Sequence, residues 1–146
     1  MTLYLDTSSL IKLYIAESGS DGVRQAASEA TAVSTSRVAY AETRAAFARL
    51  RREGQLTPSA FMSAKRQFEE QWTSYLAVEL TDALCRVAGE LAERYGLRGF
   101  DSIHLASYAE VARRASPEAT RFSSFDDRLN DASRKLTRTL ARSHSK

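Results

Sequence analysis

Acidic side chains stand at four places where the sequence passes from one kind of secondary structure to another. Asp6 directly follows the apolar run Leu3–Leu5, and Asp126 directly follows another strand-like run. Glu42 and Asp101 lie in the first turns of predicted helices. A carboxylate at the end of a buried strand is costly unless it is paired, solvated or bound to a metal. If the loops that carry these acids converge, the carboxylates meet in one cleft.

Carboxylates that gather in one cleft repel one another and bind protons more tightly unless a cation is present. Mg²⁺ and Mn²⁺ are hard ions that take oxygen ligands, few of them from protein, and leave room for water and phosphate. The histidines and the single cysteine of the chain form no zinc-binding pattern. The acids therefore predict an Mg²⁺ or Mn²⁺ site for phosphate chemistry, in which the metal lowers the pKa of a bound water.

Each acid taken alone also has a simpler explanation. Asp101 and Asp126 could be helix caps, because Asp is favoured at that position. Glu42 could be a solvated helix residue. Asp6 is harder to explain in this way, because it interrupts a strand-to-helix run that is otherwise apolar. The hypothesis of a metal site therefore depends on the acids as a set.

Other phosphate-handling and hydrolytic enzymes have motifs that this chain lacks. An aspartate-nucleophile phosphatase has a second Asp two residues after the first, where this chain has Ser8. The chain also lacks the acidic pair of a receiver domain, a Gly-rich phosphate loop and the G-x-S-x-G turn of a serine hydrolase. His104 shares a helix face with Asp101 and is either a general base or a hydrogen-bonded core histidine. Ser124 either binds water or phosphate or is a strand residue without a role.

Short strands and longer helices alternate along the chain, and they must position the acids. We expect strands at Leu3–Asp6, Thr31–Thr35, Ala77–Leu80 and Arg121–Phe125. We expect helices at Ser8–Ala16, Ser20–Ala30 and Arg37–Glu53, a helix after Thr57-Pro58 that includes Trp72, a helix between Thr81 and Gly96, a helix at about Asp101–Arg114 and a last one from near Asp126. Strands that alternate with helices need crossover connections. The pattern predicts an α/β domain with a mostly parallel sheet covered on both faces.

The composition bounds the class of protein. The chain has 146 residues, of which 43% are hydrophobic and 27% charged, as expected for one globular domain. Its single cysteine, Cys85, excludes an internal disulfide, suits a reducing compartment and is expected in the core. No apolar run reaches the roughly 18 residues of a membrane span. We also find no signal peptide, so we expect a cytoplasmic protein.

Positive charge is concentrated at the C-terminus. The net charge is +3, and residues 134–146 contain five basic side chains and no acid. Without this segment the rest of the chain has more acidic than basic groups. We therefore divide the chain into a main domain at residues 1–133 and a basic tail at residues 134–146. The tail is expected to be solvated or disordered, with RNA phosphate binding as the alternative.

Four sequence blocks resemble the motifs of one enzyme family. Four blocks follow one another in the chain: LYLDTSSLIKLY, VAYAETRAAFARLRREG, LRGFDSIHLASYAE and RFSSFDDRLNDAS. From the first to the last they span nearly its whole length. Together they resemble the motif blocks of PIN-domain ribonucleases, most closely the VapC-type toxins of bacterial toxin–antitoxin pairs. The family's acids fall on Asp6, Glu42, Asp101 and Asp126, although Asp127 is a second candidate for the last position.

The resemblance implies a three-layer α/β/α domain that cuts RNA with Mg²⁺ or Mn²⁺. Asp6 and Asp101 would be the main metal ligands, Glu42 would orient the attacking water, and Asp126 would hold a second metal or a water. The resemblance also implies a homodimer and a VapB-type antitoxin. For that antitoxin Tyr14, Tyr40 and Phe47 are either contacts or ordinary core residues. A PIN nuclease of RNA processing, and a binding module with an unused site, remain alternatives.

Overall fold

The computed structural model describes all residues 1–146 and is built on a parallel sheet of four strands in the order β3-β2-β1-β4. The strands are β1 (Thr2–Leu5), β2 (Ala32–Ser36), β3 (Leu76–Val78) and β4 (Thr120–Ser123). Leu3 of β1 is in register with Val33 of β2 on one side and with Arg121 of β4 on the other. All four predicted strands are present, and their bounds are shifted by one or two residues.

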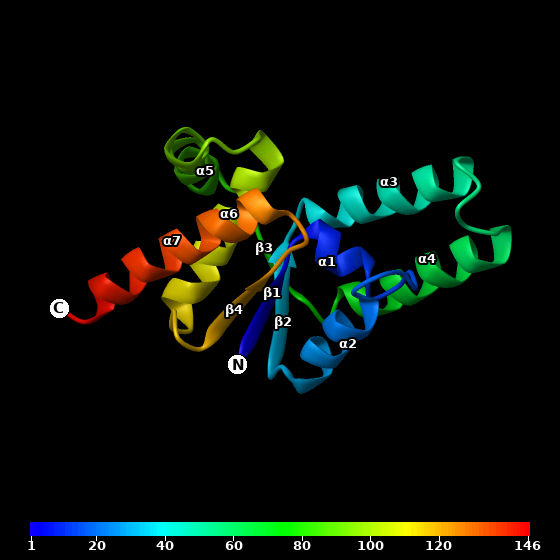
Figure 1. Cartoon of the computed structure of the whole chain (residues 1–146), viewed down its shortest axis with the longest axis horizontal. Helices are drawn as coiled ribbons and strands as arrows, with labels where there is room; N and C mark the ends of the chain where they lie inside the picture. The colour runs from blue at the N-terminus through cyan, green and yellow to red at the C-terminus, as the bar shows by residue number, and fades with distance from the viewer.

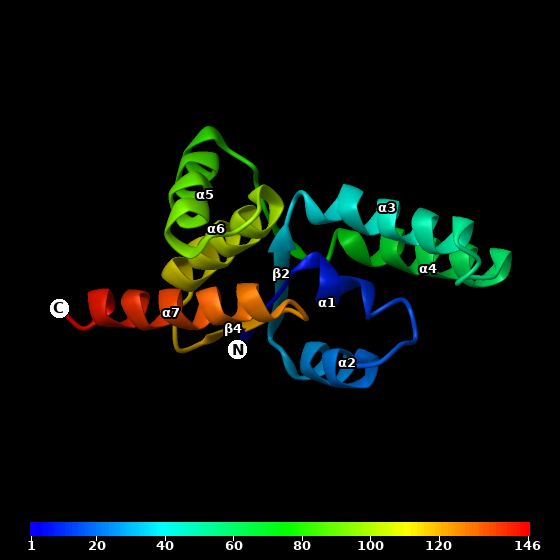
Figure 2. The ribbon, with the colours of Figure 1, turned by 45° about the horizontal axis from the view of Figure 1, so that its top comes forward.

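Helices connect the strands and cover both faces of the sheet (Figures 1 and 2). They are α1 (Thr7–Ile11), α2 (Ser20–Glu29), α3 (Ala39–Arg52), α4 (Pro58–Trp72), α5 (Asp82–Tyr95), α6 (Gly99–Arg114) and α7 (Asp127–His144). Helices α1 to α4 lie on one side of the sheet and α5 to α7 on the other (Figure 2). This arrangement confirms the predicted three-layer α/β/α fold.

The alternation of side chains in β1 divides the core into two. Leu3 and Leu5 point into the cluster formed with α1 to α4, in which Phe47 and Phe68 are fully buried. Tyr4 points to the opposite face and packs with α5, α6 and α7. A strand buried on both faces has apolar residues on both, as the run Leu3-Tyr4-Leu5 predicts.

Local signals fix where the helices begin and end. Thr57 and Thr81 cap α4 and α5 by accepting hydrogen bonds from the backbone N–H three residues later. Gly96 ends α5 with a φ of +62°, a conformation that suits glycine.

The aromatic residues considered as antitoxin contacts belong to the core side of the α3–α4 pair. Phe47 is fully buried, and the half-buried Tyr14 and Tyr40 pack against Phe68.

Three expectations are wrong. The helix after Asp6 ends at Ile11 and not at Ala16, because the chain turns through hydrogen bonds between residues three apart. Cys85 is exposed, because α5 turns Leu84 and Ala88 toward the core and leaves Cys85 on its outer side. The segment after residue 133 is helical up to His144 and not disordered, because Leu136 and Leu140 bury α7 against α6.

No helix of the protein combines the length and the apolar composition that a membrane span needs.

Candidate active site

Three strands of the sheet end at the same edge, and the acids lie beyond it. Asp6 directly follows β1, and Asp126 comes three residues after β4 ends at Ser123. Glu42 lies in the first turn of α3, the helix that follows β2. Asp101 lies in the first turn of α6, which packs on β2 and β4. In open α/β sheets, binding sites form beyond the carboxyl ends of the strands.

Asp6 is the most enclosed of these acids, with 4% of its surface exposed. Its Oδ1 accepts hydrogen bonds from Ser8 Oγ at 2.7 Å and from the backbone N–H of Ser9 at 3.0 Å. Its Oδ2 accepts from Ser124 Oγ at 2.5 Å. The carboxylate therefore caps α1 and is held in one orientation, which leaves part of Oδ2 free to accept another partner.

Glu42 is half-buried and anchored through a single oxygen. Its Oε1 accepts from Thr7 Oγ1 at 2.7 Å and lies 2.9 Å from His104 Nε2, while Oε2 has no partner in the chain. Burial raises the pKa of Glu42, but the interactions of its carboxylate with His104 and Thr7 outweigh burial. The net pKa lies below the ordinary value, so Glu42 is a carboxylate at neutral pH.

Asp101 has the opposite environment. Its carboxylate accepts no hydrogen bond in the chain, and its nearest cation is Arg98, 3.7 Å away and largely exposed. Burial raises the pKa of Asp101 above its ordinary value, and the negative charges of Asp126 and Asp6 raise it further. Arg98 and His104 lower this pKa, but by less. Asp101 therefore lies close enough to two other acids to be disfavoured as an anion.

Asp126 caps a helix and also lies near the other acids, two explanations that the sequence offered as alternatives. Its Oδ1 caps α7 by accepting from the backbone N–H of Leu129 at 2.8 Å. Its own backbone N–H donates to Ser124 Oγ at 3.0 Å, so Ser124 joins Asp126 to Asp6. Asp126 Oδ2 has no partner in the chain. Asp127, the other candidate for this position, is exposed in the first turn of α7 and makes no side-chain hydrogen bond.

The structure brings Asp6, Asp101 and Asp126 within electrostatic reach of one another and places Glu42 beside His104. No three His, Cys, Asp or Glu side chains lie close enough together to form a complete set of metal ligands. Every acid of the set nevertheless keeps an oxygen, or part of one, that no protein donor uses. A set of free carboxylate oxygens without thiolate or imidazole ligands fits a hard divalent ion that is bound largely through water and substrate.

Several side chains of the site were not singled out from the sequence. Tyr4, Thr7, Ser8 and Ser9 make contacts on which the geometry of the acids depends. The run Asp6-Thr7-Ser8-Ser9 offered a signal, because hydroxyl side chains next to an acid at a helix start often hydrogen-bond to it or to the backbone. Tyr4 gave no such signal, because in sequence it is one more apolar residue of β1.

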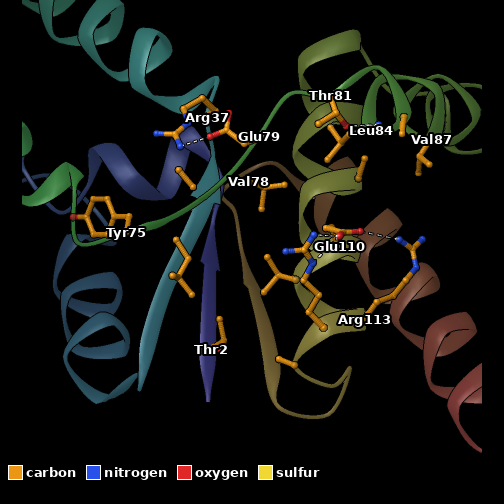
Figure 3. A pocket seen from close by; sticks show the side chains of 17 residues that line it. Thr2, Arg37, Tyr75, Val78, Glu79, Thr81, Leu84, Val87, Glu110 and Arg113 are labelled. Carbon is orange, nitrogen blue, oxygen red and sulfur yellow. Dashed lines mark hydrogen bonds and ion pairs between the residues drawn. The ribbon is translucent and has the colours of Figure 1, made fainter.

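A separate groove lies away from the acids. It has a volume of about 790 Å³ and runs between β3 and helices α5 and α6, and none of the four acids lines it. Its charged groups are already paired, Arg37 with Glu79 at one end and Glu110 with Arg113 and Arg114 at the other (Figure 3). The acids therefore lie outside this groove.

Comparison with known proteins decides the family. The profile of the PIN domain matches residues 3–135, which is most of the chain and includes all four acids. The chain belongs to the PIN-domain family. It is 40% identical over 109 residues to Ribonuclease VapC45 of Mycobacterium tuberculosis strain CDC 1551 / Oshkosh and, to the same extent, to Ribonuclease VapC49 of strain ATCC 25618 / H37Rv. The match covers 75% of this chain and 76% of each relative. The resemblance seen in the sequence blocks is confirmed.

Proposed function

We propose that this PIN-domain protein is an endoribonuclease that hydrolyses RNA phosphodiester bonds with Mg²⁺ or Mn²⁺, and that it is the toxin of a toxin–antitoxin pair. The observation that carries the proposal is the environment of Asp101. It is an acid without a hydrogen bond, and burial and two neighbouring acids raise its pKa. Such an arrangement costs stability in the free protein, and a bound cation removes that cost. The two curated ribonucleases to which the chain is similar support the same activity.

The residues have separate tasks in this proposal. Asp6 and Asp101 provide the oxygens that hold the divalent ion, and Asp126 Oδ2 holds a second ion or a water. When bound, the ion neutralises charge on the attacked phosphate and lowers the pKa of a water. Glu42, a carboxylate at neutral pH, presents its free Oε2 to orient the attacking water and accept its proton. One P–O bond of the RNA backbone breaks, and the leaving oxygen takes a proton.

Two exposed aromatic rings border the acids. Phe100 directly precedes Asp101 and is 59% exposed, and Phe125 directly precedes Asp126 and is 49% exposed. The ammonium group of Lys12 lies 4.4 Å from the centre of the Phe125 ring. Lys12 pairs with Glu17 at 2.9 Å, so the exposed rings themselves are the binding feature. Aromatic rings bind single-stranded nucleic acid because bases stack on them. The face therefore suits an unpaired RNA segment, such as a loop of tRNA or rRNA.

The proposal extends to partners. A VapB-type antitoxin restrains the enzyme by covering the acids, and a basic side chain of the antitoxin among these carboxylates relieves their repulsion as a cation does. We also propose a homodimer and a cytoplasmic location, where the RNA substrate is found. Co-expression with the antitoxin encoded next to the gene is expected to restore growth. Growth that stays inhibited would contradict the toxin role and favour general RNA processing.

The activity is tested by incubating the purified protein with labelled tRNA and rRNA fragments in Mn²⁺, Mg²⁺ or EDTA. We expect cleavage with either metal and none in EDTA. Asp101→Asn is expected to abolish cleavage, because a neutral amide binds a hard cation more weakly than a carboxylate does. Asp131→Asn is a matched control, since Asp131 is an exposed acid of α7 paired with Arg134 and Lys135. Cleavage in EDTA, or undiminished cleavage by Asp101→Asn, would contradict the proposal.

A further inference from the structure

His104 is a buried side chain with both ring nitrogens engaged. It is 2% exposed and lies between the core and the acids. Its Nδ1 is 2.9 Å from the hydroxyl oxygen of Tyr4, and its Nε2 is 2.9 Å from Glu42 Oε1 and 3.1 Å from Thr7 Oγ1. Its partners come from β1, α1 and α3, and it reaches them from α6. A single imidazole therefore joins four elements of the fold at the active site.

The chemistry of the partners gives each hydrogen bond a direction. A carboxylate only accepts, so Nε2 carries the proton and donates to Glu42. In the neutral ring Nδ1 is then an acceptor, and the Tyr4 hydroxyl donates to it. A phenol keeps its proton at neutral pH, so the Tyr4 hydroxyl is able to donate this bond. The chain of donors runs from Tyr4 through His104 to Glu42.

Tyr4 is itself held rigidly by the core. It is fully buried, its ring stacks on Phe122 with centroids 5.6 Å apart, and it meets Tyr108 edge to face at 6.1 Å. The position of the His104 ring therefore depends on packed aromatic side chains and not on a mobile loop. His104 and Thr7 both hold Glu42 Oε1, so the carboxylate cannot rotate freely and its other oxygen is left unpaired. A histidine that served packing alone would not need a site carboxylate as its partner.

We propose that His104, oriented by Tyr4, is a positioning residue that fixes Glu42 for catalysis, an inference that rests on the ribonuclease function proposed above. His104 does not touch the substrate. It acts through Glu42, by holding Oε1 so that Oε2 is presented to the attacking water. Outer hydrogen-bond partners of this kind typically change activity by about tenfold to a hundredfold when they are removed.

A matched pair of amide substitutions tests the positioning role. The amide nitrogen of Gln reaches about as far as Nε2, whereas that of Asn reaches only about as far as Nδ1. His104→Gln is therefore expected to keep most of the parent kcat, and His104→Asn to lose about tenfold to a hundredfold, with KM for RNA unchanged within about twofold. If His104→Asn does not fold, Tyr4→Phe takes its place, because it removes only the hydroxyl and is expected to lower kcat in the same way. Parent-like kcat in folded His104→Asn or Tyr4→Phe would overturn the inference.

The protonation of the ring gives a readout that does not need activity. In ¹⁵N-labelled protein, long-range proton–nitrogen correlation spectra report which ring nitrogens carry hydrogen, and we expect a proton on Nε2 of His104. A proton on Nδ1 alone would overturn the inference even in an active enzyme. A parent that cuts no RNA with any metal would instead overturn the proposed function, and the positioning role of His104 with it. The two failures are thus distinguished.

Discussion

The hydroxyl of Ser124 lies 2.5 Å from Asp6 Oδ2 and donates a hydrogen bond to it. These residues are far apart in sequence, and the contact joins the end of β4 to the end of β1. The same hydroxyl oxygen accepts from the backbone N–H of Asp126 at 3.0 Å. Ser124 therefore connects two of the acids on which the proposed activity depends, and the structure gives it a role that the sequence left open.

Ser124→Ala is expected to weaken both the fold and the activity. It leaves the buried Asp6 carboxylate one donor short, which costs about 1–3 kcal/mol of unfolding free energy. It also frees Asp6 to turn, so RNA cleavage falls. Ser123→Ala is the matched control, because the Ser123 hydroxyl meets only Ser9 Oγ and no acid. Denaturant unfolding and cleavage rates check both variants, and equal effects of the two would contradict the role given to Ser124.

Capping and catalysis can be separated at Asp126. Asn caps a helix about as well as Asp, so Asp126→Asn should keep the stability of the parent while it loses activity. Asp126→Ala should lose activity and also about 1 kcal/mol of stability. Asp127→Asn is the control and is expected to change neither. Thermal melts and cleavage assays decide the matter, and full activity of Asp126→Asn would show that Asp126 is a cap alone.

The exposed ring of Phe100 is expected to contribute to RNA binding. Removal of one stacking ring typically costs about 1–3 kcal/mol of binding free energy. Phe100→Ala should therefore raise KM for single-stranded RNA with a smaller effect on kcat. Met62→Ala is the control, since Met62 is also 59% exposed but lies on α4. Equal KM values for the two variants, measured with the same labelled fragment, would argue against stacking at Phe100.

The sequence predicts the layers of the fold well, because each short apolar run is followed by an amphipathic helix with its own cap. It predicts less where tertiary packing decides. The turn after Ile11 and the outward direction of Cys85 depend on neighbouring elements that no local pattern contains. The helix of residues 127–144 extends past the predicted start of the tail, because two leucines placed four residues apart bury it against α6.

The acids were named from the sequence because each lies where one predicted element ends or another begins. Their hydrogen-bond partners could not be predicted in the same way. Glu42 and His104 are 62 residues apart, and Tyr4 and His104 are 100 apart. A single sequence contains no signal that such distant residues meet. Four acids with assigned roles remain a prediction until variants are measured.

Two acids of the site should have opposite effects on the stability of the metal-free protein. The pKa of Asp101 is raised in the folded state, so the parent loses stability as pH rises from the ordinary Asp value of about 3.9. Asp101→Asn removes this loss and should melt higher than the parent at pH 7 but not at pH 3. The pKa of Glu42 is lowered, so its stabilisation is present above about pH 4.3 and is lost as pH falls through its folded value. Glu42→Gln should therefore melt lower than the parent at pH 7.

These melts are measured in EDTA. Each 1 kcal/mol corresponds to about 2–4 °C for a domain of this size. A Glu42→Gln variant as stable as Asp101→Asn at neutral pH would contradict the environments described for the two carboxylates.

If these acids form one site for a divalent cation, Mn²⁺ shifts the melting temperature of the protein. An ion that binds only the folded protein stabilises it by about 2.7 kcal/mol at a hundredfold excess over its dissociation constant. For the parent we expect the melting temperature to rise by several degrees, to saturate with Mn²⁺ and to return to its starting value in EDTA. Asp101→Asn, which disturbs no hydrogen bond, should show little of this rise, while Asp131→Asn should match the parent. A parent melting temperature that is indifferent to millimolar Mn²⁺ and Mg²⁺ would contradict the account.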